Sequence, residues 1–536
     1  MRDTGNLEER SIRKVPKCCV FSNYTQKSSA FAGKFSHLKF KNLSIYAHLR
    51  RLCGIIEASK AGGNSSMMTQ DNDKARSQIQ MFSIDELVPH DHLLRIIDKA
   101  IDWSFIYDLV KDTYADGVGR PSIDPVTLIK IPLIQYLYGI KSMRQTIKDI
   151  EVNVAYRWFL GLEFYEDVPH FSTFSKNYTR RFKDTDLFEQ IFQHILEECY
   201  KFRLVDPSEI FVDATHVKAR ANNKKMQRRI AQQEALFYAD MLRKDINTDR
   251  EAHGKKPLKD NDKNNKPGAG GGDKFEDYTD DVPLDGKTIK CSTTDPESGW
   301  FRKGEHKNVF AYGIETACDK NGWIINFTVN PGNEHDSRTF KGLYDKLDGT
   351  GMKYCIVDAG YKTPAIAKML LDDGVQPVFP YKRPMTKDGF FKKYEYVYDE
   401  YNDFYICPNN KELTYRTTNK DGYREYRSCG IACANCQYLS QCTANRDHVK
   451  TVTRHVWEDY MEKCEDIRLT LGMKKLYSHR KETIERIFGT AKENHGFRYT
   501  QMYGKARMIM KTALTYACMN LKKLAKIKNE WGLQMA

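Results

Sequence analysis

The chain has 536 residues, enough for roughly two to four domains, and its 40% hydrophobic and 29% charged residues exclude a disordered or fibrous protein. Its net charge of +14 is concentrated towards the two ends of the chain, which favours a polyanionic partner such as nucleic acid. No apolar run approaches the roughly 20 residues that span a bilayer, and the first residues lack the layout of a secretion signal, so we expect a cytoplasmic protein without membrane contact.

The first 204 residues divide into two parts. Residues 1–80 are rich in Ser, Lys and Asn without periodicity, and we expect a poorly ordered basic segment. Residues 81–204 carry helix signals, which predict an all-helical domain. These signals are a capping box at Ser83 and Glu86, a helix start at Asp124-Pro125, and apolar periodicity over 143–160 and 186–202. Basic and polar residues on these helices suit contact with DNA.

The next part of the chain predicts a mixed sheet flanked by helices. Two short apolar runs, 209–213 and 353–358, each end in an aspartate, and a hairpin is expected over 310–329 around the turn Asp319–Gly322. A helix over 364–371 and an edge strand over 375–379 follow. Around residue 222 the chain turns polar and helix-prone, and residues 255–272 are a Gly, Asn, Lys and Asp stretch that cannot bury enough surface to order itself, so residues 222–285 are predicted to be a flexible excursion. We therefore predict an α/β catalytic domain formed by residues 205–397 and 450–525.

Three acids are candidates for a divalent-metal site. Asp213 and Asp358 each follow a predicted strand, and carboxylate oxygens are the ligands that Mg²⁺ prefers. Two ions about 3.5–4 Å apart need roughly three acids to hold them. The third acid is expected on a helix, and Glu485 is our candidate because Phe488 and Lys492 share its helix face. Glu482 is the rival, and an exposed helix with ordinary charge pairs is the alternative for both.

The cysteines between residues 398 and 449 mark a predicted Cys-rich insertion. Cys433 and Cys436 have the spacing of a structural zinc knuckle, and Cys407 and Cys442 would complete four thiolates. Cys429 is a surplus candidate that could replace one of them. The alternative is a reduced, metal-free hairpin.

Several motifs together make the chain resemble the bacterial insertion-sequence transposases that have a helical N-terminal domain and a DDE catalytic domain. In chain order they are Glu86-Leu-Val-Pro-His-Asp-His92, Gly119-Arg-Pro-Ser-Ile-Asp-Pro125, Tyr136-Leu-Tyr-Gly139, Tyr156-Arg-Trp-Phe-Leu-Gly161, Phe211-Val-Asp-Ala-Thr-His-Val217, Thr294-Asp-Pro296, His335-Asp-Ser337, Val357-Asp-Ala-Gly-Tyr361 and Glu485-Arg-Ile-Phe-Gly489 with Lys492. The resemblance extends from about residue 82 to 523. Each motif is weak alone, but so many in order are specific.

The resemblance implies a ribonuclease-H-like catalytic domain with Asp213, Asp358 and Glu485 as its DDE triad. It also implies that Tyr477, Arg480 and Lys492 complete the family's signature around the last acid and contact DNA phosphates. The gap from Arg480 to Glu485 is one residue longer than in the commonest form of that signature. His216 and His335 are candidates for positions close to the metals, with a purely structural role as the alternative.

The implied activity is that of a cut-and-paste DNA transposase, a metal-dependent endonuclease and strand transferase that uses two Mg²⁺ or Mn²⁺ ions. The implied partners are transposon terminal inverted repeats, target DNA and further copies of the chain in a homodimer or higher assembly at the bacterial nucleoid. Two rivals are a non-catalytic DNA-binding protein and a metal nuclease without strand transfer.

Overall fold

The computed structural model describes residues 79, 81–114, 122–223, 225–230, 237–258, 288–303, 307–383 and 386–532. Contacts divide the chain into a unit that ends at Met81 and one that begins at Phe82, and every described helix and strand belongs to the second. The predicted basic segment 1–80, the turn Gly119–Pro121 and part of the predicted excursion therefore lie outside the described residues. Within those residues, no helix is long and apolar enough to cross a membrane.

The N-terminal part of the second unit is helical, as predicted. Its helices are α2 (Ile84–Leu87), α3 (Leu93–Asp98), α4 (Phe105–Val110), η2 (Lys111–Thr113), α5 (Pro125–Leu137), α6 (Met143–Val152), α7 (Val154–Leu160), α8 (Phe171–Asn177), η3 (Tyr178–Phe182) and α9 (Leu187–Lys201). The capping box at Ser83 and the cap at Asp124 are confirmed. The single helical stretch predicted over 143–160 is two helices, because extended Asn153 ends α6 and caps α7 through its side chain.

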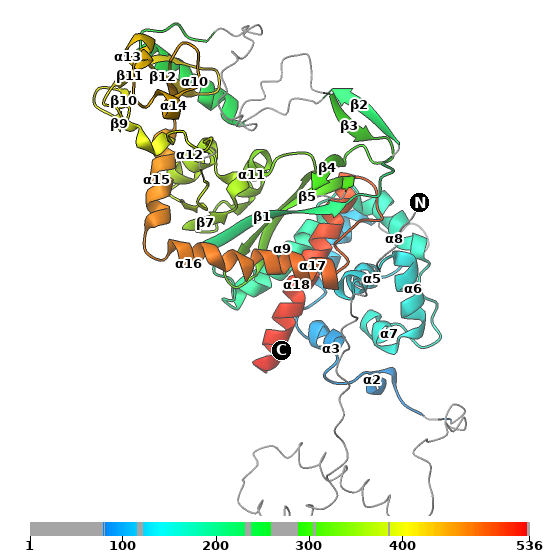
Figure 1. Ribbon diagram of the computed structural model, residues 1–536. Helices are drawn as coiled ribbons and strands as arrows, with labels where there is room; N and C mark the ends of the chain where they lie inside the picture. Colours follow the sequence, from blue (N-terminus) through cyan, green and yellow to red (C-terminus); the bar gives the residue numbers. More distant parts are fainter. Residues whose placement is uncertain are drawn as a thin grey trace, which may run out of the picture. The chain divides into compact units, whose positions relative to one another are not determined.

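A sheet of eight strands follows in a mixed α/β arrangement (Figure 1). Its strands are β1 (Glu209–Lys218), β2 (Met226–Ile230), β3 (Thr288–Ser292), β4 (Gly299–Lys303), β5 (Lys307–Asp319), β6 (Ile324–Pro331), β7 (Tyr354–Val357) and β8 (Gln376–Val378). The order is β2-β3-β4-β5-β1-β7-β8, and β6 pairs with β5. The β1–β7 and β7–β8 pairs are parallel, and the other pairs are antiparallel. The predicted hairpin is β5–β6, and β8 lies at the edge that Pro377 indicated.

Helices cover both faces of this sheet. They are α11 (Asp336–Tyr344), η4 (Asp345–Leu347), η5 (Ala359–Tyr361), α12 (Pro364–Asp372), α15 (Glu458–Leu469), α16 (Met473–Ser478), η7 (His479–Lys481), α17 (Ile484–Asn494) and α18 (Lys505–Glu530). Thr316 on β5 shares a 2.7 Å hydrogen bond with Tyr516 of α18, so α18 covers the face to which Thr316 points. Glu315, the preceding residue, accepts a hydrogen bond from Tyr361 of η5, so η5 lies on the opposite face.

The helical part and the sheet share one hydrophobic core. Helix α18 contacts α9, α5 and α3 as well as β6, and one cluster of buried residues extends from Leu94 to Ala525 (Figure 1). That residues 81–204 and the catalytic domain have separate functions stays a prediction. In packing, the two parts form one body, because the C-terminal helix lies between them.

The predicted flexible excursion 222–285 contains ordered elements. Strands β2 and β3 pair with each other, and α10 (Phe237–Ala252) lies between them in the chain. Leu242 and Ile246 of α10 are buried against Ala365 and Trp457. A flexible conformation was therefore wrong for β2 and α10, whereas the helix-prone composition from residue 222 agrees with α10.

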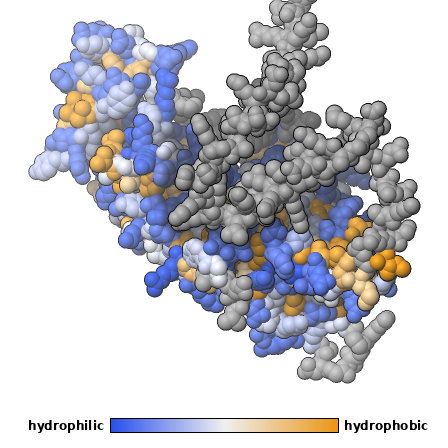
Figure 2. All heavy atoms as spheres, turned by 90° about the horizontal axis from the view of Figure 1, so that it is seen from below, coloured by the Kyte–Doolittle hydropathy of each residue, from blue (hydrophilic) through white to orange (hydrophobic). Residues whose placement is uncertain are grey.

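The Cys-rich insertion forms a second sheet of five strands in the order β13-β12-β11-β10-β9. Its elements are η6 (Lys393–Glu395), β9 (Val397–Asp399), β10 (Phe404–Ile406), β11 (Glu412–Thr418), β12 (Tyr423–Ser428), α13 (Gly430–Ala434), α14 (Leu439–Cys442) and β13 (Thr451–His455). It has a small core of its own around Tyr405, Leu413 and Tyr426. Elsewhere the surface in view is largely hydrophilic, with hydrophobic residues in small groups (Figure 2).

Candidate active site

The parallel pairing of β1 and β7 brings Asp213 and Asp358 side by side. Val212 pairs with Val357 in the last step of this ladder, and the next residue of each chain segment is the aspartate. The prediction that Asp213 closes its strand was wrong, because β1 continues to Lys218 by pairing with β5. Asp358 does close β7 and precedes the 3₁₀ turn η5.

A single guanidinium contacts both aspartates. Arg480 lies 2.7 Å from the Oδ2 atom of Asp213 and 3.1 Å from the Oδ1 atom of Asp358. The hydroxyl of Tyr477 donates to the same Oδ1 atom of Asp358 at 3.3 Å and accepts from Arg480 at 3.3 Å. These contacts place Tyr477 and Arg480 at the aspartates, whereas the sequence predicted that both side chains contact phosphates.

The surroundings of Asp213 disfavour its charged form. Burial raises the pKa of Asp213 to about 6, and the negative charges of Asp358 and Asp336 add to this rise. Arg480 and the Ala214 amide, which donates to Asp213, act in the opposite direction. A cation beside Asp213 therefore relieves an unfavourable charge. Carboxylate donors that already surround one positive charge suit a divalent ion such as Mg²⁺.

Asp336 is an acid that the sequence analysis missed. It lies in the first turn of α11, and its Oδ2 atom is 3.9 Å from the position that a Cβ atom on Gly360 would occupy. The signal was present in the His335-Asp-Ser337 motif, where only the histidine was considered. His335 itself caps α11 through its side chain and lies beside the same glycine.

His216 does not lie with the acids. Asp213 and His216 are three positions apart on one strand, so their side chains point to opposite faces of the sheet. The His216 ring stacks on Phe301 of β4 with 3.6 Å between the ring centroids. The prediction that His216 lies near the metals was wrong, since a strand alternates its faces.

Glu485 lies in the first turn of α17, on the helix that the sequence predicted. Ile484, Phe488 and Ala491 form the buried face of α17, which contacts β1 and β5, whereas Glu485 and its rival Glu482 are exposed. In the part of the chain that the structure describes, Glu485 makes no hydrogen bond or ion pair, and no group of three or more acidic, histidine or cysteine side chains converges as a metal site. Its place in a triad stays a prediction.

The extra residue between Arg480 and Glu485 has a structural explanation. Arg480 lies in the 3₁₀ turn η7, and Thr483 has φ −107° and ψ −92°, outside the helical region. The chain therefore breaks between α16 and α17, so Arg480 and Glu485 are not on one continuous helix. Lys492 is half-buried further along α17.

A close contact with the helical part holds the end of α17. A Cβ atom on Gly139 would lie 2.7 Å from the carbonyl oxygen of Asn494, and Gly139 has φ +63°. The ring of His495 donates through Nδ1 to the carbonyl oxygen of Tyr136 at 2.8 Å. The Tyr136-Leu-Tyr-Gly139 motif thus packs against the C-terminal end of the helix that carries Glu485.

A buried acid lies on the other face of β5. Glu315 accepts hydrogen bonds from the hydroxyls of Thr328 and Tyr361, both at 3.2 Å. Burial raises the pKa of Glu315 to about 8, so this carboxyl is largely protonated at neutral pH. Tyr361 belongs to the turn that follows Asp358, so Glu315 supports the segment that positions Asp358.

Two comparisons with protein families bear on this chain. Residues 82–180 match the family described as Transposase domain (DUF772), and residues 406–525 match the family described as Transposase DDE domain. No curated protein and no solved structure matches the chain. The two family matches support an insertion-sequence DDE transposase.

The DDE match implies a ribonuclease-H-like fold, in agreement with the mixed sheet and its flanking helices. Glu485 lies inside the segment matched to the DDE domain, and Asp213 and Asp358 precede it. The assignment of the two aspartates therefore rests on their geometry and motifs.

The insertion holds the predicted zinc ligands, although among the described residues they do not converge as a formed metal site. Cys407, Cys433, Cys436 and Cys442 line one cavity of about 20 Å³, which is about the space that one water molecule needs. Cys429 is exposed and does not line this cavity. The cysteines of the described segments form no disulfide bond.

Hydrogen-bond donors surround three of these sulfur atoms. The Lys411 amide donates to Cys407 at 3.3 Å, and the Asn409 side chain donates to Cys436 at 3.4 Å. The Tyr396 hydroxyl lies 3.2 Å from Cys442. Burial raises the pKa of the Cys442 thiol, and the negative charges of Cys407 and Cys433 add to this rise, so a cation would favour the thiolate forms.

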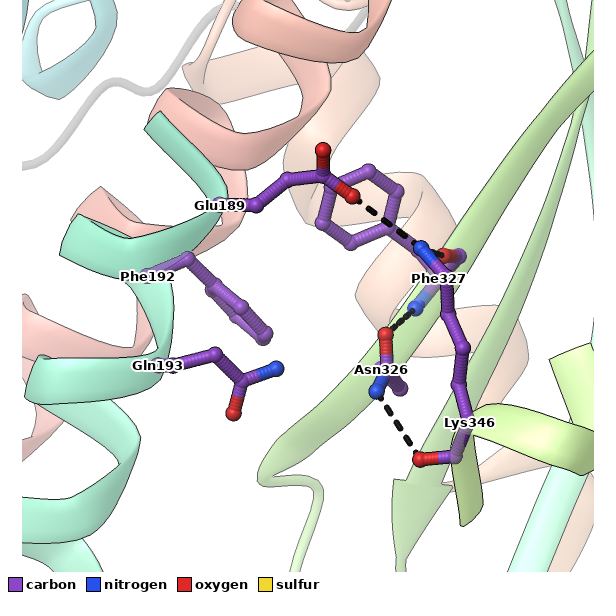
Figure 3. Close-up of a pocket in the computed structure, with 6 residues that line it drawn as sticks. All are labelled: Glu189, Phe192, Gln193, Asn326, Phe327 and Lys346. Carbon is purple, nitrogen blue, oxygen red and sulfur yellow. Dashed lines mark hydrogen bonds and ion pairs between the residues drawn. The ribbon is translucent and has the colours of Figure 1, made fainter. Parts of the chain in front are cut away.

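A larger cavity of about 260 Å³ lies between α9 and β6 of the transposase. Figure 3 shows Glu189 and Lys346 joined across its mouth, with Phe192 and Phe327 in its wall. None of its lining residues is a candidate ligand or phosphate contact. This cavity therefore adds nothing to the argument for catalysis.

Proposed function

We propose that the chain is a cut-and-paste transposase that cleaves transposon ends and joins them to target DNA by metal-assisted phosphoryl transfer. The observation that carries this proposal is the placement of Asp213 and Asp358 around one positive charge. The two transposase family matches supply the substrate class, which is DNA. Its terminal repeats and target would be bound by assembled copies of the chain at the nucleoid.

Asp213, Asp358 and Glu485 would hold the divalent ions, Mg²⁺ or Mn²⁺. Two such ions supply activation of the attacking oxygen and stabilisation of the leaving oxygen. Tyr477 orients Asp358 through its hydroxyl hydrogen bond. Lys492 would place its ammonium group near the phosphate from the same helix as Glu485.

The helical part would bind the terminal repeats. Arg180 is exposed on the last turn before α9, and Lys141 and Arg144 lie at the start of α6. Positive side chains on helices suit contact with phosphates, which sets the register of a protein on DNA. Because this part packs on α18 and α17, DNA bound to it would lie on the same body as the catalytic acids.

We also propose that Cys407, Cys433, Cys436 and Cys442 bind one structural Zn²⁺. Four thiols around a cavity of this size, with hydrogen-bond donors to three sulfur atoms, support this proposal. The five-stranded sheet has only a small hydrophobic core, and small domains often depend on a metal ion.

The test of catalysis is a joining assay with precut transposon ends, target DNA and Mg²⁺ or Mn²⁺. Asp213→Ala, Asp358→Ala and Glu485→Ala should each lower joining by at least about a thousandfold, because metal ligands act as a unit. Asp345→Ala is the matched control, since Asp345 is an exposed aspartate paired with Lys341 away from the site. Cleavage of uncut ends without any joining would instead favour a nuclease.

A further inference from the structure

The guanidinium of Arg480 occupies the space between two carboxylates that our proposed function gives to a metal ion. Arg480 is only 5% exposed, and its contacts at 2.7 Å and 3.1 Å join it to both aspartates. It contacts the Oδ2 atom of Asp213 and the Oδ1 atom of Asp358. A divalent ion shared by the two aspartates would have to replace these contacts.

Each oxygen atom of the Asp213 carboxylate already has one partner. Its Oδ1 atom accepts from the Ala214 amide at 2.8 Å, and its Oδ2 atom contacts Arg480. A cation that binds Asp213 through Oδ2 therefore competes directly with the guanidinium. Asp358 is more open, since half of its side chain is exposed.

The position of Arg480 is also incompletely satisfied. Among the described residues, its Nε atom is buried and has no hydrogen-bond partner. A buried donor without a partner is energetically unfavourable. Arg480 lies in the three-residue turn η7, next to the non-helical Thr483, and not inside a long helix. The contacts with the two aspartates, and not a regular helix, therefore fix the position of the Arg480 side chain.

We propose that Arg480 is a resident counter-ion that a divalent cation must displace, and that its displacement frees the guanidinium for a DNA phosphate. Without metal, Arg480 neutralises the two aspartates and keeps them close together. With metal, the same positive charge would repel the incoming ion and has to move. One side chain would thus couple metal entry to the binding of substrate. This inference rests on the proposed metal site.

The test measures binding of Mn²⁺ to the full-length, zinc-loaded protein without DNA, by the electron paramagnetic resonance signal of free Mn²⁺. Arg480→Met should bind Mn²⁺ at least about tenfold more tightly than wild type, since a positive charge beside the ion is removed. The same variant should join DNA ends less well. A merely structural role would weaken binding and joining together.

Arg454→Met is the matched control. Arg454 is 4% exposed and also pairs with two carboxylates, those of Asp459 and Glu462, but it lies on β13. This control should leave Mn²⁺ affinity unchanged. Tyr477→Phe is a conservative second variant in case Arg480→Met fails to fold, because it removes one partner of the guanidinium. It should tighten Mn²⁺ binding by a smaller factor, because it also removes the hydrogen bond that orients Asp358.

Two results would overturn the inference, and they differ in what else they reject. If neither Arg480→Met nor Tyr477→Phe tightens binding, but Asp213→Asn with Asp358→Asn abolishes it, the counter-ion role is wrong and the metal site stands. If the two asparagine substitutions leave Mn²⁺ binding unchanged, the metal site and the counter-ion role are both wrong.

Discussion

The aspartate pair and the cysteine cluster are two candidate metal sites that the fold builds in different ways. Strand register places Asp213 beside Asp358, and a protein cation already lies between them. The four cysteines come from turns and short helices around a small cavity, and three of their sulfurs have hydrogen-bond donors. Under our proposals, the first site would take an ion that enters and leaves, and the second would hold an ion that stays.

Loss of the proposed zinc should have the largest effect, because a structural zinc site contributes on the order of 10 kcal/mol to folding. Cys436→Ser should lower the zinc content from about one ion per chain to near zero. It should also expose residues 397–455 to limited proteolysis. Elemental analysis of protein purified without chelators gives the first readout.

Cys429→Ser is the control for this prediction, since Cys429 lies in the same segment but does not line the cavity. It should retain its zinc. Wild-type protein that contains no zinc would contradict the proposed zinc site. A Cys436→Ser variant that retains its zinc would also contradict it.

The buried acid beneath the aspartate pair should give the next largest effect. The folded-state pKa of Glu315 is about 8, well above its ordinary value of 4.5, so folding takes up a proton between these values. The stability of wild type relative to Glu315→Gln should therefore be greatest near pH 4.5. It should fall by roughly 1.4 kcal/mol per pH unit as the pH rises towards 8.

Urea unfolding of both proteins at pH 5.5, 6.5 and 7.5 measures this slope. Glu412→Gln, at an exposed glutamate of β11, should show no such dependence. A stability difference that does not change with pH would mean that Glu315 is ionised in the folded protein. Tyr361, in the turn after Asp358, would then donate its hydrogen bond to a charged carboxylate.

The smallest predicted effect concerns the contact that holds α17. Gly139→Ala and Gly161→Ala both place a side chain at a positive φ, which costs about 1–2 kcal/mol. Only Gly139 has a neighbour, the Asn494 carbonyl at 2.7 Å from the new Cβ atom, whereas nothing lies within 4 Å at Gly161. Gly139→Ala should therefore be the more destabilising by about 1–3 kcal/mol in thermal or urea unfolding.

Gly139→Ala should also weaken DNA joining, because it displaces the helix that carries Glu485. Equal destabilisation by the two alanines would show that the contact adds nothing beyond backbone strain. In that case the motif Tyr136-Leu-Tyr-Gly139 would need another explanation.

The sequence placed each aspartate after an apolar run, which is a local signal, but it did not predict that the two strands pair in parallel. It did not predict that β1 continues past Asp213, since that depends on the partner strand β5. The composition around residue 222 indicated a helix but not its packing, because the partners of α10, Ala365 and Trp457, are distant in the chain. The five-stranded sheet was missed because its short strands are held by a small tyrosine-rich core.

The candidate site shows the same limit. The family resemblance implied that Tyr477 and Arg480 contact phosphates, but it gave no sign that both would contact Asp358. That contact depends on how the turn η7 faces the end of β7. Glu485 was placed on the correct kind of element, a helix packed on β1, but its direction relative to the aspartates depends on tertiary structure.

The central claim is that Asp213, Asp358 and Glu485 share one divalent-ion site when DNA ends are bound. Fe²⁺ bound at such a site, with ascorbate and peroxide, cuts the polypeptide near its ligands. We predict cuts near residues 213, 358 and 485 of the complex with precut ends, suppressed by excess Mg²⁺ and absent in Asp213→Ala. Cuts near the two aspartates but not near Glu485, or no localised cuts, would contradict the account.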